Sequence, residues 1–408
     1  MVKYLLHIVL FIRYRLFFFC CCCLLFSSCS NEGYFYPITP QPEKETQRII
    51  IAYLAGDNSL SSEIEQKIAA LTVGFLSADY SQNRLFIYYD RKHVSPQLLE
   101  ISADTETPRQ ILKTYTTQNS ASAEVMKQVL NDILKNYSAS SYGLILFSHG
   151  SAWLSAGGLE EPYKGENLEK GDIDSSRRST RSVCTDGESE MELTDFAAAL
   201  PLPGNKKWDF ILFEGCYMGS VEVAYELKDK TEAIIASPTE IVSPGMTEVY
   251  PSALPYLFQP TPGLEKFAQA YFNTWDSKTG DYRSATISVV RTGYLEELAQ
   301  LARAAFLRWE PDAETISALQ CFNRNEWHLF FDLKEALLTA NPALSTYVDG
   351  LWKSIVTYSA ATPSFLPGLA YGFTIHAHSG LSCYVPQRDF LYANQGYTQT
   401  AWCGTVYQ

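Results

Sequence analysis

The chain has 408 residues, of which 46% are hydrophobic and 19% are charged. This length and composition predict a folded protein with a large core and exclude a disordered chain. The formal net charge of −13 argues against a nucleic-acid-binding function, because a phosphate backbone is bound mainly by Lys and Arg.

Residues 1–28 have the pattern of an export signal. A basic start precedes an unbroken apolar run from Leu16 to Phe26, and Ser27 and Ser28 then lead to Cys29. This ending resembles a bacterial lipoprotein signal, in which Cys29 is lipidated. We therefore expect an exported protein anchored to the cell envelope by lipid, with the outer membrane as the expected membrane. A cleaved secreted protein and an uncleaved anchor remain open as alternatives.

Five cysteines lie beyond the signal and Cys29: Cys184, Cys216, Cys321, Cys383 and Cys403. Because five is odd, at least one thiol stays free even in an oxidising compartment. If a disulfide forms, Cys383 and Cys403 are the expected pair.

After a polar tether over 29–47, short apolar runs alternate with amphipathic segments, which is typical of a parallel sheet covered by helices. The predicted strands are 48–55, 84–90, 142–150, 207–216 and 232–238, and the predicted helices lie within 56–71, 121–137, 193–201 and 217–229. Residues 151–190 are predicted to form a long exposed loop. We expect one main domain over 48–263 and an appended, mainly helical region over 264–408 that packs on the sheet and includes a late strand pair, 369–377 with 381–386.

Two predicted strands end in similar polar turns. One delivers Ser148-His149-Gly150, and the other delivers Glu214-Gly215-Cys216. Because parallel strands place their carboxyl ends along one crevice, neighbouring strands would bring the imidazole and the thiol face to face. We interpret Cys216 as the start of a helix, whose positive end favours a thiolate. A thiolate, an imidazole and two backbone N–H donors suffice for acyl transfer.

Each residue alone also has a structural interpretation. A lone cysteine is more often a packing residue than a nucleophile, and Asp57 and Asn58 fit turn or capping roles as well as a place near the pocket. His376 and His378 have a spacing found in zinc sites, but further ligands are missing, so no metal site is predicted. A serine hydrolase on the same sheet is disfavoured because the G-x-S-x-G turn is missing.

At these residues the sequence resembles the clostripain family of cysteine endopeptidases. The similar segments are "YLAGDNSL", "YGLILFSHGSAW", "DGESEMELTDFAAAL", "FEGCYMGSVEVAYEL" and "GLSCYVPQ…YTQTAW", and together they extend over most of 48–408. The resemblance implies the caspase–gingipain–legumain type of fold. The expected fold class is therefore α/β, a caspase-like αβα sandwich with a mostly parallel central sheet.

Carried over to this chain, the resemblance implies His149 as general base and acid and Cys216 as nucleophile. The N–H groups of Gly150 and Cys216 would form the oxyanion hole. Family members cut after Arg or Lys and hold the substrate cation with an acid two residues before the cysteine, here Glu214, where Asp is commoner. Glu240 is the candidate for a second acid.

The family is made as zymogens that cut themselves after a basic residue between the His and the Cys. The candidates here are Lys164, Lys170, Arg177, Arg178 and Arg181, although these residues also fit a solvated loop. Calcium dependence occurs in the family, and the acidic segment "EKGDID" is a possible site whose ligands nothing fixes. No redox or organic cofactor is implied.

The sequence thus predicts a lipid-anchored cysteine endopeptidase that cleaves peptides or proteins after Arg, with Lys as the second choice. The alternative is a catalytically inactive surface lipoprotein of the same fold that binds peptides or an envelope partner. The departures from the family pattern at Glu214 and Gly215 motivate it, and retention of His149 and Cys216 argues against it.

Overall fold

The computed structural model describes residues 46–78, 80–102, 107–163 and 183–408. All the described elements belong to one compact unit, Glu45–Gln408. The signal, the lipidation residue Cys29 and the five candidate cleavage residues lie outside the described residues. None of the helices in the described ranges combines the length and the apolar character needed to span a bilayer.

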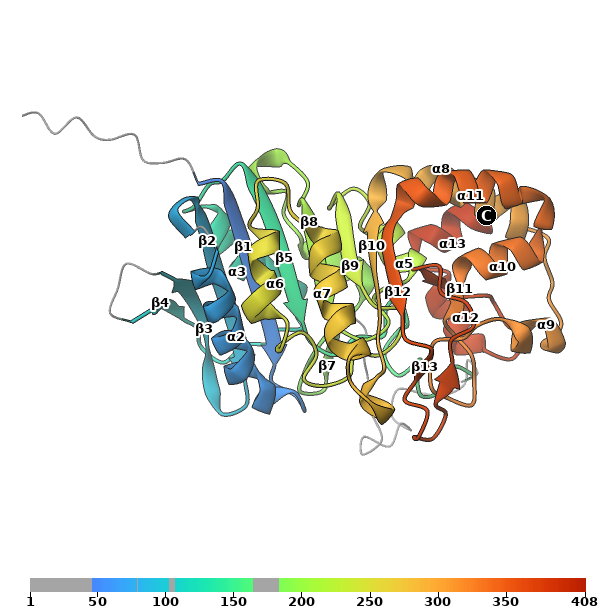
Figure 1. Cartoon of the computed structure of the whole chain (residues 1–408), viewed down its shortest axis with the longest axis horizontal. Helices are drawn as coiled ribbons and strands as arrows, with labels where there is room; N and C mark the ends of the chain where they lie inside the picture. Colours follow the sequence, from blue (N-terminus) through green and yellow to red (C-terminus); the bar gives the residue numbers. More distant parts are fainter. Residues whose placement is uncertain (1–45, 79, 103–106, 164–182) are drawn as a thin grey trace, which may run out of the picture. The chain divides into compact units, whose positions relative to one another are not determined.

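A nine-stranded sheet forms the centre of this unit, in the order β12-β10-β9-β8-β5-β1-β2-β3-β4 (Figure 1). Its strands are β1 (Arg48–Gly56), β2 (Asn83–Arg91), β3 (Val94–Ile101), β4 (Arg109–Thr114), β5 (Ser141–Phe147), β8 (Phe210–Glu214), β9 (Ala233–Ala236), β10 (Thr286–Arg291) and β12 (Val356–Ala361). The inner strands of the sheet are parallel to one another, in the order β9-β8-β5-β1-β2. The outer strands on both sides are antiparallel to their neighbours.

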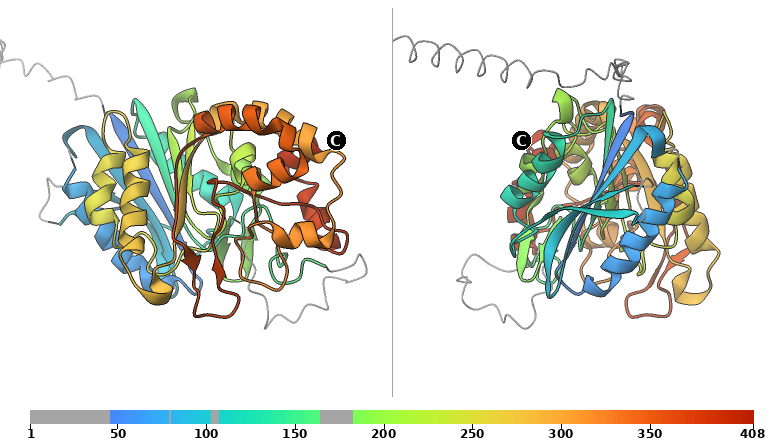
Figure 2. Two further views of the ribbon diagram at one scale, coloured as in Figure 1. Left: turned by 45° about the vertical axis from the view of Figure 1, so that its right-hand side comes forward. Right: turned by 90° about the vertical axis from the view of Figure 1, so that its left-hand side faces the viewer.

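Helices cover both faces of the sheet (Figures 1 and 2). One face packs against α2 (Ile64–Leu76), α6 (Tyr250–Leu257) and α7 (Leu264–Asp276). The other packs against α3 (Ala123–Leu134), α4 (Leu193–Ala199) and α5 (Val221–Glu226), and this core continues into α8 (Leu295–Phe306), α10 (Leu333–Ala340), α11 (Ser345–Ile355) and α13 (Ala401–Val406). Along β1, successive side chains from Ile49 to Ala55 enter the two cores in turn, so this part of the strand is buried and apolar on both faces.

Short elements complete the chain. They are α9 (Ala313–Ala318), α12 (Leu391–Tyr397), and the 3-10 helices η1 (Ser61–Glu63), η2 (Tyr80–Gln82), η4 (Pro203–Asn205), η5 (Gly280–Tyr282), η6 (Thr292–Tyr294) and η7 (Pro342–Leu344). Three two-stranded ladders pair β6 (Cys184–Asp186) with β7 (Ser189–Met191), β11 (Phe331–Asp332) with β15 (Ser382–Cys383), and β13 (Ser364–Phe365) with β14 (Phe373–Thr374).

The predicted fold class and the five predicted strands are confirmed, but the C-terminal third differs from the prediction. Residues after 263 contribute α7, β10 and β12, so they complete the central sheet instead of being appended to it. The predicted late strand pair is wrong, because its two segments pair with other partners, β13 and β11. These pairings join segments that are distant in sequence, and local patterns carry little information about such partners.

The predicted exposed loop over 151–190 is wrong at both of its ends. Trp153 is buried, and its ring packs against those of Phe330, Tyr384 and Tyr397. At the other end β6 and β7 form a hairpin. The expected Cys383–Cys403 disulfide is also wrong, since all five described cysteines are free thiols.

Helix α2 reaches α6 closely because Gly74 has no side chain. A Cβ at this position would collide with the carbonyl oxygen of Tyr250 and lie 2.8 Å from Cβ of Leu254. We predict that Gly74→Ala destabilises the fold by about 1–3 kcal/mol, the usual cost of overpacking. Gly350→Ala, in an exposed part of α11 where no atom lies within 4 Å of the new Cβ, should be neutral or stabilising by up to about 1 kcal/mol.

Urea unfolding of both variants measures the difference. Equal stabilities for the Gly74→Ala and Gly350→Ala chains would contradict the close packing of α2 on α6.

Candidate active site

The turns after β5 and β8 lie side by side. The two strands are parallel neighbours, and their register pairs Phe147 with Glu214. His149 and Cys216 each follow that pair by two residues. The structure therefore brings the predicted imidazole and thiol to the same edge of the sheet, and both residues line one cavity.

Two glycines let these turns touch through their backbones. A Cβ at Gly150 would lie 2.7 Å from the carbonyl oxygen and 3.3 Å from the amide nitrogen of Cys216. A Cβ at Gly215 would lie 3.3 Å from the carbonyl oxygen of Ser148. The backbone amides predicted to form an oxyanion hole, those of Gly150 and Cys216, thus belong to two turns in direct contact.

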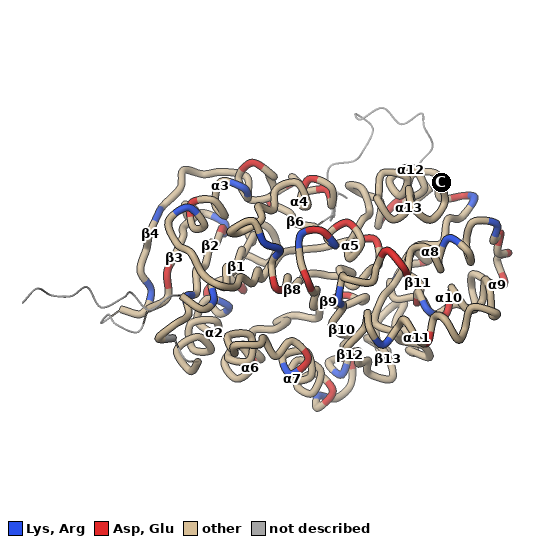
Figure 3. Tube along the Cα trace, turned by 90° about the horizontal axis from the view of Figure 1, so that it is seen from above, with Lys and Arg blue, Asp and Glu red and all other residues tan. Residues whose placement is uncertain are grey.

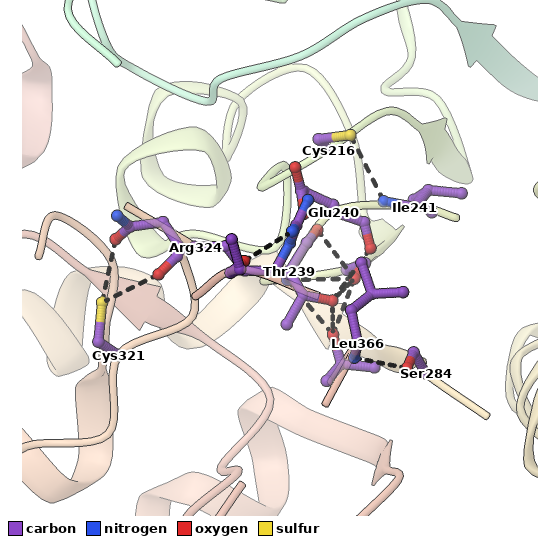
Figure 4. Close-up of polar contacts among 12 residues, drawn as sticks. Cys216, Thr239, Glu240, Ile241, Ser284, Cys321, Arg324 and Leu366 are labelled. Atoms are coloured by element: carbon purple, nitrogen blue, oxygen red, sulfur yellow. Dashed lines mark hydrogen bonds and ion pairs between the residues drawn. The ribbon is translucent and has the colours of Figure 1, made fainter. Parts of the chain in front are cut away.

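Cys216 lies on a tight turn. Its Sγ accepts a hydrogen bond from the amide of Ile241 at 3.4 Å (Figure 4). The next residue, Tyr217, has a φ of 63°, a conformation that costs a side-chain-bearing residue on the order of 1–3 kcal/mol. Stacking of its buried ring on Phe330, with centroids 4.7 Å apart, supports this conformation.

The predicted helix start at Cys216 is wrong. Helix α5 begins only at Val221, and the hydroxyl of Ser220 caps it by accepting from the amide of Val223 at 3.3 Å. The residues between Cys216 and Ser220 form a turn. A helix dipole is therefore not a reason to expect a reactive thiol at Cys216, since the effect of a dipole falls off within the first turn.

The other described cysteines differ from Cys216 in burial. Cys216 is partly exposed, whereas the remaining four are buried. Burial raises the pKa of Cys184 to about 12 and those of Cys321 and Cys403 to about 11, and it raises the pKa of Cys383 well above its ordinary value. These four thiols stay protonated near neutral pH, so Cys216 is the one placed to react within the described chain.

His149 has a hydrogen-bonding partner that sequence reasoning missed. Its Nε2 lies 2.7 Å from Oγ of Ser59, which follows β1, the strand next to β5. Asn58 has the predicted turn role, because its Oδ1 accepts from the amide of Leu60 at 2.8 Å. It is buried and donates to the carbonyl oxygens of Ala55 at 3.1 Å and Thr185 at 3.0 Å.

Thr185 also contacts the turn that carries His149, because its amide donates to Oγ of Ser148 at 3.0 Å. Residues on both sides of the Ser59–His149 contact are therefore tied to one strand, β6. The segment "GDNSL" at the exit of β1 was the signal in the sequence, but only the strand order shows that it meets His149.

The cavity that contains Cys216 has a volume of about 450 Å³. Its apolar lining comes from Leu60, Phe147, Ile241, Val242, Leu366 and Leu369, and its carboxylates are Glu63, Glu214, Glu240 and Asp281. Among the described residues that line it, Arg324 is the single Lys or Arg. The lining thus has a negative balance of charge. Elsewhere Lys and Arg are interspersed with Asp and Glu along the chain (Figure 3).

Glu214 lies in this lining, as predicted, but its carboxylate already has a cation. The Lys67 ammonium lies 2.6 Å from Oε1 of Glu214, and both side chains are almost fully buried. Tyr250 donates its hydroxyl to Glu214 at 2.7 Å, and the amide of Met246 donates to it as well. Glu214 therefore fixes the segment around Met246, and sequence reasoning missed Lys67 because it comes from the distant helix α2.

Glu240 also lies in the lining and also has a partner. Its Oε2 accepts from Nε of Arg324 at 2.5 Å (Figure 4). Both side chains are about one-fifth exposed, at 22% and 20%. Burial opposes the charge of Arg324, yet the hydrogen bond and the attraction of Glu240 raise the pKa of its guanidinium above the ordinary value.

No group of three or more His, Cys, Asp and Glu side chains in the described ranges is arranged to hold a metal ion. His376 instead contacts Glu335, with Nε2 3.2 Å from its carboxylate. The acidic segment 169–174 lies outside the described residues.

Comparisons with known proteins agree with the geometry. The profile of the clostripain family matches residues 52–310. The structure is similar to the inactive zymogen of a protease from Parabacteroides distasonis, with a TM-score of 0.74 and 31% identity over 90% of this chain and 99% of that one.

It is also similar to a secreted cysteine protease from Bacteroides thetaiotaomicron bound to an irreversible peptide inhibitor, with a TM-score of 0.72 and 26% identity over 88% of this chain and 99% of that one. A search of curated proteins gives no match. The match of the family profile over more than half of the sequence shows that this chain belongs to the clostripain family of cysteine peptidases.

Proposed function

We propose that this cysteine peptidase is an endopeptidase that cleaves after Arg, and secondarily Lys, through a dyad of Cys216 and His149. The observation that carries the proposal is the contact between the His149 turn and the Cys216 turn at a cavity lined by carboxylates. Membership of the family supports peptides and proteins as the substrates.

The proposed reaction uses the thiol of Cys216, the imidazole of His149 and the backbone amides of Gly150 and Cys216. The sulfur of Cys216 attacks the substrate carbonyl carbon while the thiol proton passes to His149. The amides of Gly150 and Cys216 stabilise the resulting oxyanion. Collapse to a thioester breaks the peptide C–N bond, and His149 protonates the leaving amine. Water then attacks the thioester, His149 takes a proton from it, and the thiol and the new carboxylate are released.

The contact with Ser59 bears on which ring nitrogen of His149 would take part. The contact of Nε2 with the Ser59 hydroxyl at 2.7 Å supports Nδ1 as the nitrogen that exchanges protons with sulfur and with the leaving amine. The bond also restrains rotation of the ring. Ser59 is thus a positioning residue for the base.

The charge of the cavity supports a basic side chain before the cleaved bond. Glu240 is assigned as the acid that contacts the substrate cation, because it is partly exposed. Glu214 is buried with Lys67, so we assign it a structural role, which is to fix the wall of the cavity through its contacts with Met246 and Tyr250. The apolar lining suits the methylene stem of Arg or Lys.

Two further proposals concern the residues outside the described ranges. The relative from Parabacteroides distasonis is an inactive zymogen, which supports activation of this chain by self-cleavage at Lys164, Lys170, Arg177, Arg178 or Arg181. The relative from Bacteroides thetaiotaomicron is secreted, which supports export. Lipidation of Cys29 would then anchor the enzyme to the cell envelope.

The dyad is tested with the chain lacking residues 1–28 and its Cys216→Ala variant on fluorogenic peptides ending in Arg, Lys, Asp or Leu. We predict cleavage after Arg and Lys by the parent alone, because only the parent carries the nucleophile. A gel of the same samples should show two fragments for the parent and an intact chain for Cys216→Ala.

Cleavage after Asp or Leu instead would retain the dyad but contradict the role of the acidic cavity. A parent that cleaves none of the peptides, with a Cys216 thiol no more reactive toward iodoacetamide than a free thiol, would favour the alternative of an inactive peptide-binding lipoprotein.

Ser59→Ala should lower kcat by roughly two- to tenfold, which corresponds to the loss of one hydrogen bond, and leave KM unchanged. Ser59→Thr retains a hydroxyl and should restore most of kcat. Steady-state kinetics on the Arg peptide measure both variants. Equal kcat for the alanine and threonine variants, or a loss seen only in KM, would contradict the positioning role.

A further inference from the structure

We propose that Arg324 competes with the basic side chain of the substrate for the carboxylate of Glu240. Arg324 would therefore set the affinity of the enzyme for basic substrates. This inference rests on the proposed function, because it requires a substrate whose Arg or Lys side chain enters the Cys216 cavity.

The contact between Arg324 and Glu240 has the chemistry that a bound substrate would have. A guanidinium lies on a carboxylate, with Nε 2.5 Å from Oε2. Both residues line the same cavity as Cys216 and His149. A substrate Arg that reached Glu240 would find its position already occupied by an identical group.

The pair is exchangeable because it is only partly buried. Its side chains are 22% and 20% exposed, and partly hydrated ion pairs are weak compared with desolvated ones. Apart from Glu240, the hydrogen bond found for Arg324 in the described chain goes to the carbonyl oxygen of Ala370 at a long 3.3 Å. Replacing one guanidinium by another at Glu240 therefore changes few contacts.

The Lys67–Glu214 pair shows the opposite case. Lys67 is fully buried, lies 2.6 Å from Glu214, and also donates to Oγ1 of Thr247 at 2.8 Å. Its ammonium lies 4.2 Å from the centroid of the Phe147 ring. To reach Glu214, a substrate cation would have to displace the buried Lys67 ammonium from all of these contacts. Glu240 is therefore the carboxylate for which a substrate cation competes.

A second cavity adjoins Arg324 and can accept its side chain when a substrate displaces it. This cavity, of about 490 Å³, is lined by Arg324 and Glu240 on one side and by Tyr217, Glu326, Trp327 and Tyr371 among others. Aromatic faces and a carboxylate are groups that bind a guanidinium well. Because Arg324 lines both cavities, the second cavity is the place that the inference assigns to its displaced guanidinium.

Arg324→Met tests the inference, because it keeps much of the side-chain length and removes the competing charge. We expect KM for a peptide ending in Arg to fall about three- to tenfold, as the loss of a weak competing pair predicts, while kcat changes less than twofold. Glu240→Gln should shift KM in the opposite direction. KM for a peptide ending in the uncharged residue norleucine should not fall in Arg324→Met.

Arg291→Met is the matched control, since Arg291 forms an ion pair with Glu265 at 3.0 Å and does not line either cavity. It should leave KM unchanged. If Arg324→Met does not fold, Arg324→Lys, which keeps the charge but loses the planar fork, should give a smaller fall in KM.

A rise in KM, or a loss of kcat, in both Arg324 variants would overturn the inference and make Arg324 a support for Glu240. An unchanged KM in the active, folded Arg324→Met enzyme would overturn it as well. A parent without Cys216-dependent cleavage of the Arg peptide would instead show that the proposed function itself is wrong.

Discussion

The candidate active site depends on the pairing of β5 with β8. These strands are parallel neighbours whose register ends with Phe147 opposite Glu214. Because both faces of the sheet are packed against helices, a one-residue slip would move every side chain of a strand from the core it fits into the opposite one. The turn that carries His149 and the turn that carries Cys216 are consequently held against each other, and glycines at 150 and 215 let their backbones touch. The chemistry is thus positioned by the sheet.

Two ion pairs then shape the cavity in different ways. The Lys67–Glu214 pair is desolvated and multiply bonded, so it acts as a permanent part of the cavity wall. The Arg324–Glu240 pair is partly exposed and adjoins a second cavity, so it can exchange partners. A carboxylate in a specificity pocket is therefore not sufficient evidence of a vacant binding site for a cation, since the chain can supply the cation itself.

The parts predicted from sequence are those determined by local pattern. Apolar runs gave the strands, and the polar turns after them located His149 and Cys216. The missed residues are those whose role depends on distant partners: Ser59 meets His149 through strand order, and Arg324 lies between α9 and β11, far from Glu240 in the chain. Helix α5 begins at Val221 and not at Cys216, because the Ser220 hydroxyl can accept a hydrogen bond from the first turn of the helix as its N-cap. Only the three-dimensional structure could supply these contacts.

The central claim is that the thiol of Cys216 attacks the carbonyl carbon of a peptide whose basic side chain lies in the acidic cavity. Its most direct test is mass spectrometry of the protein after incubation with a peptidyl chloromethyl ketone ending in Arg. The account predicts a single adduct on Cys216 that forms much more slowly with the corresponding Asp reagent and is lost in His149→Ala. An adduct on another cysteine, or equal labelling by the Arg and Asp reagents, would contradict it.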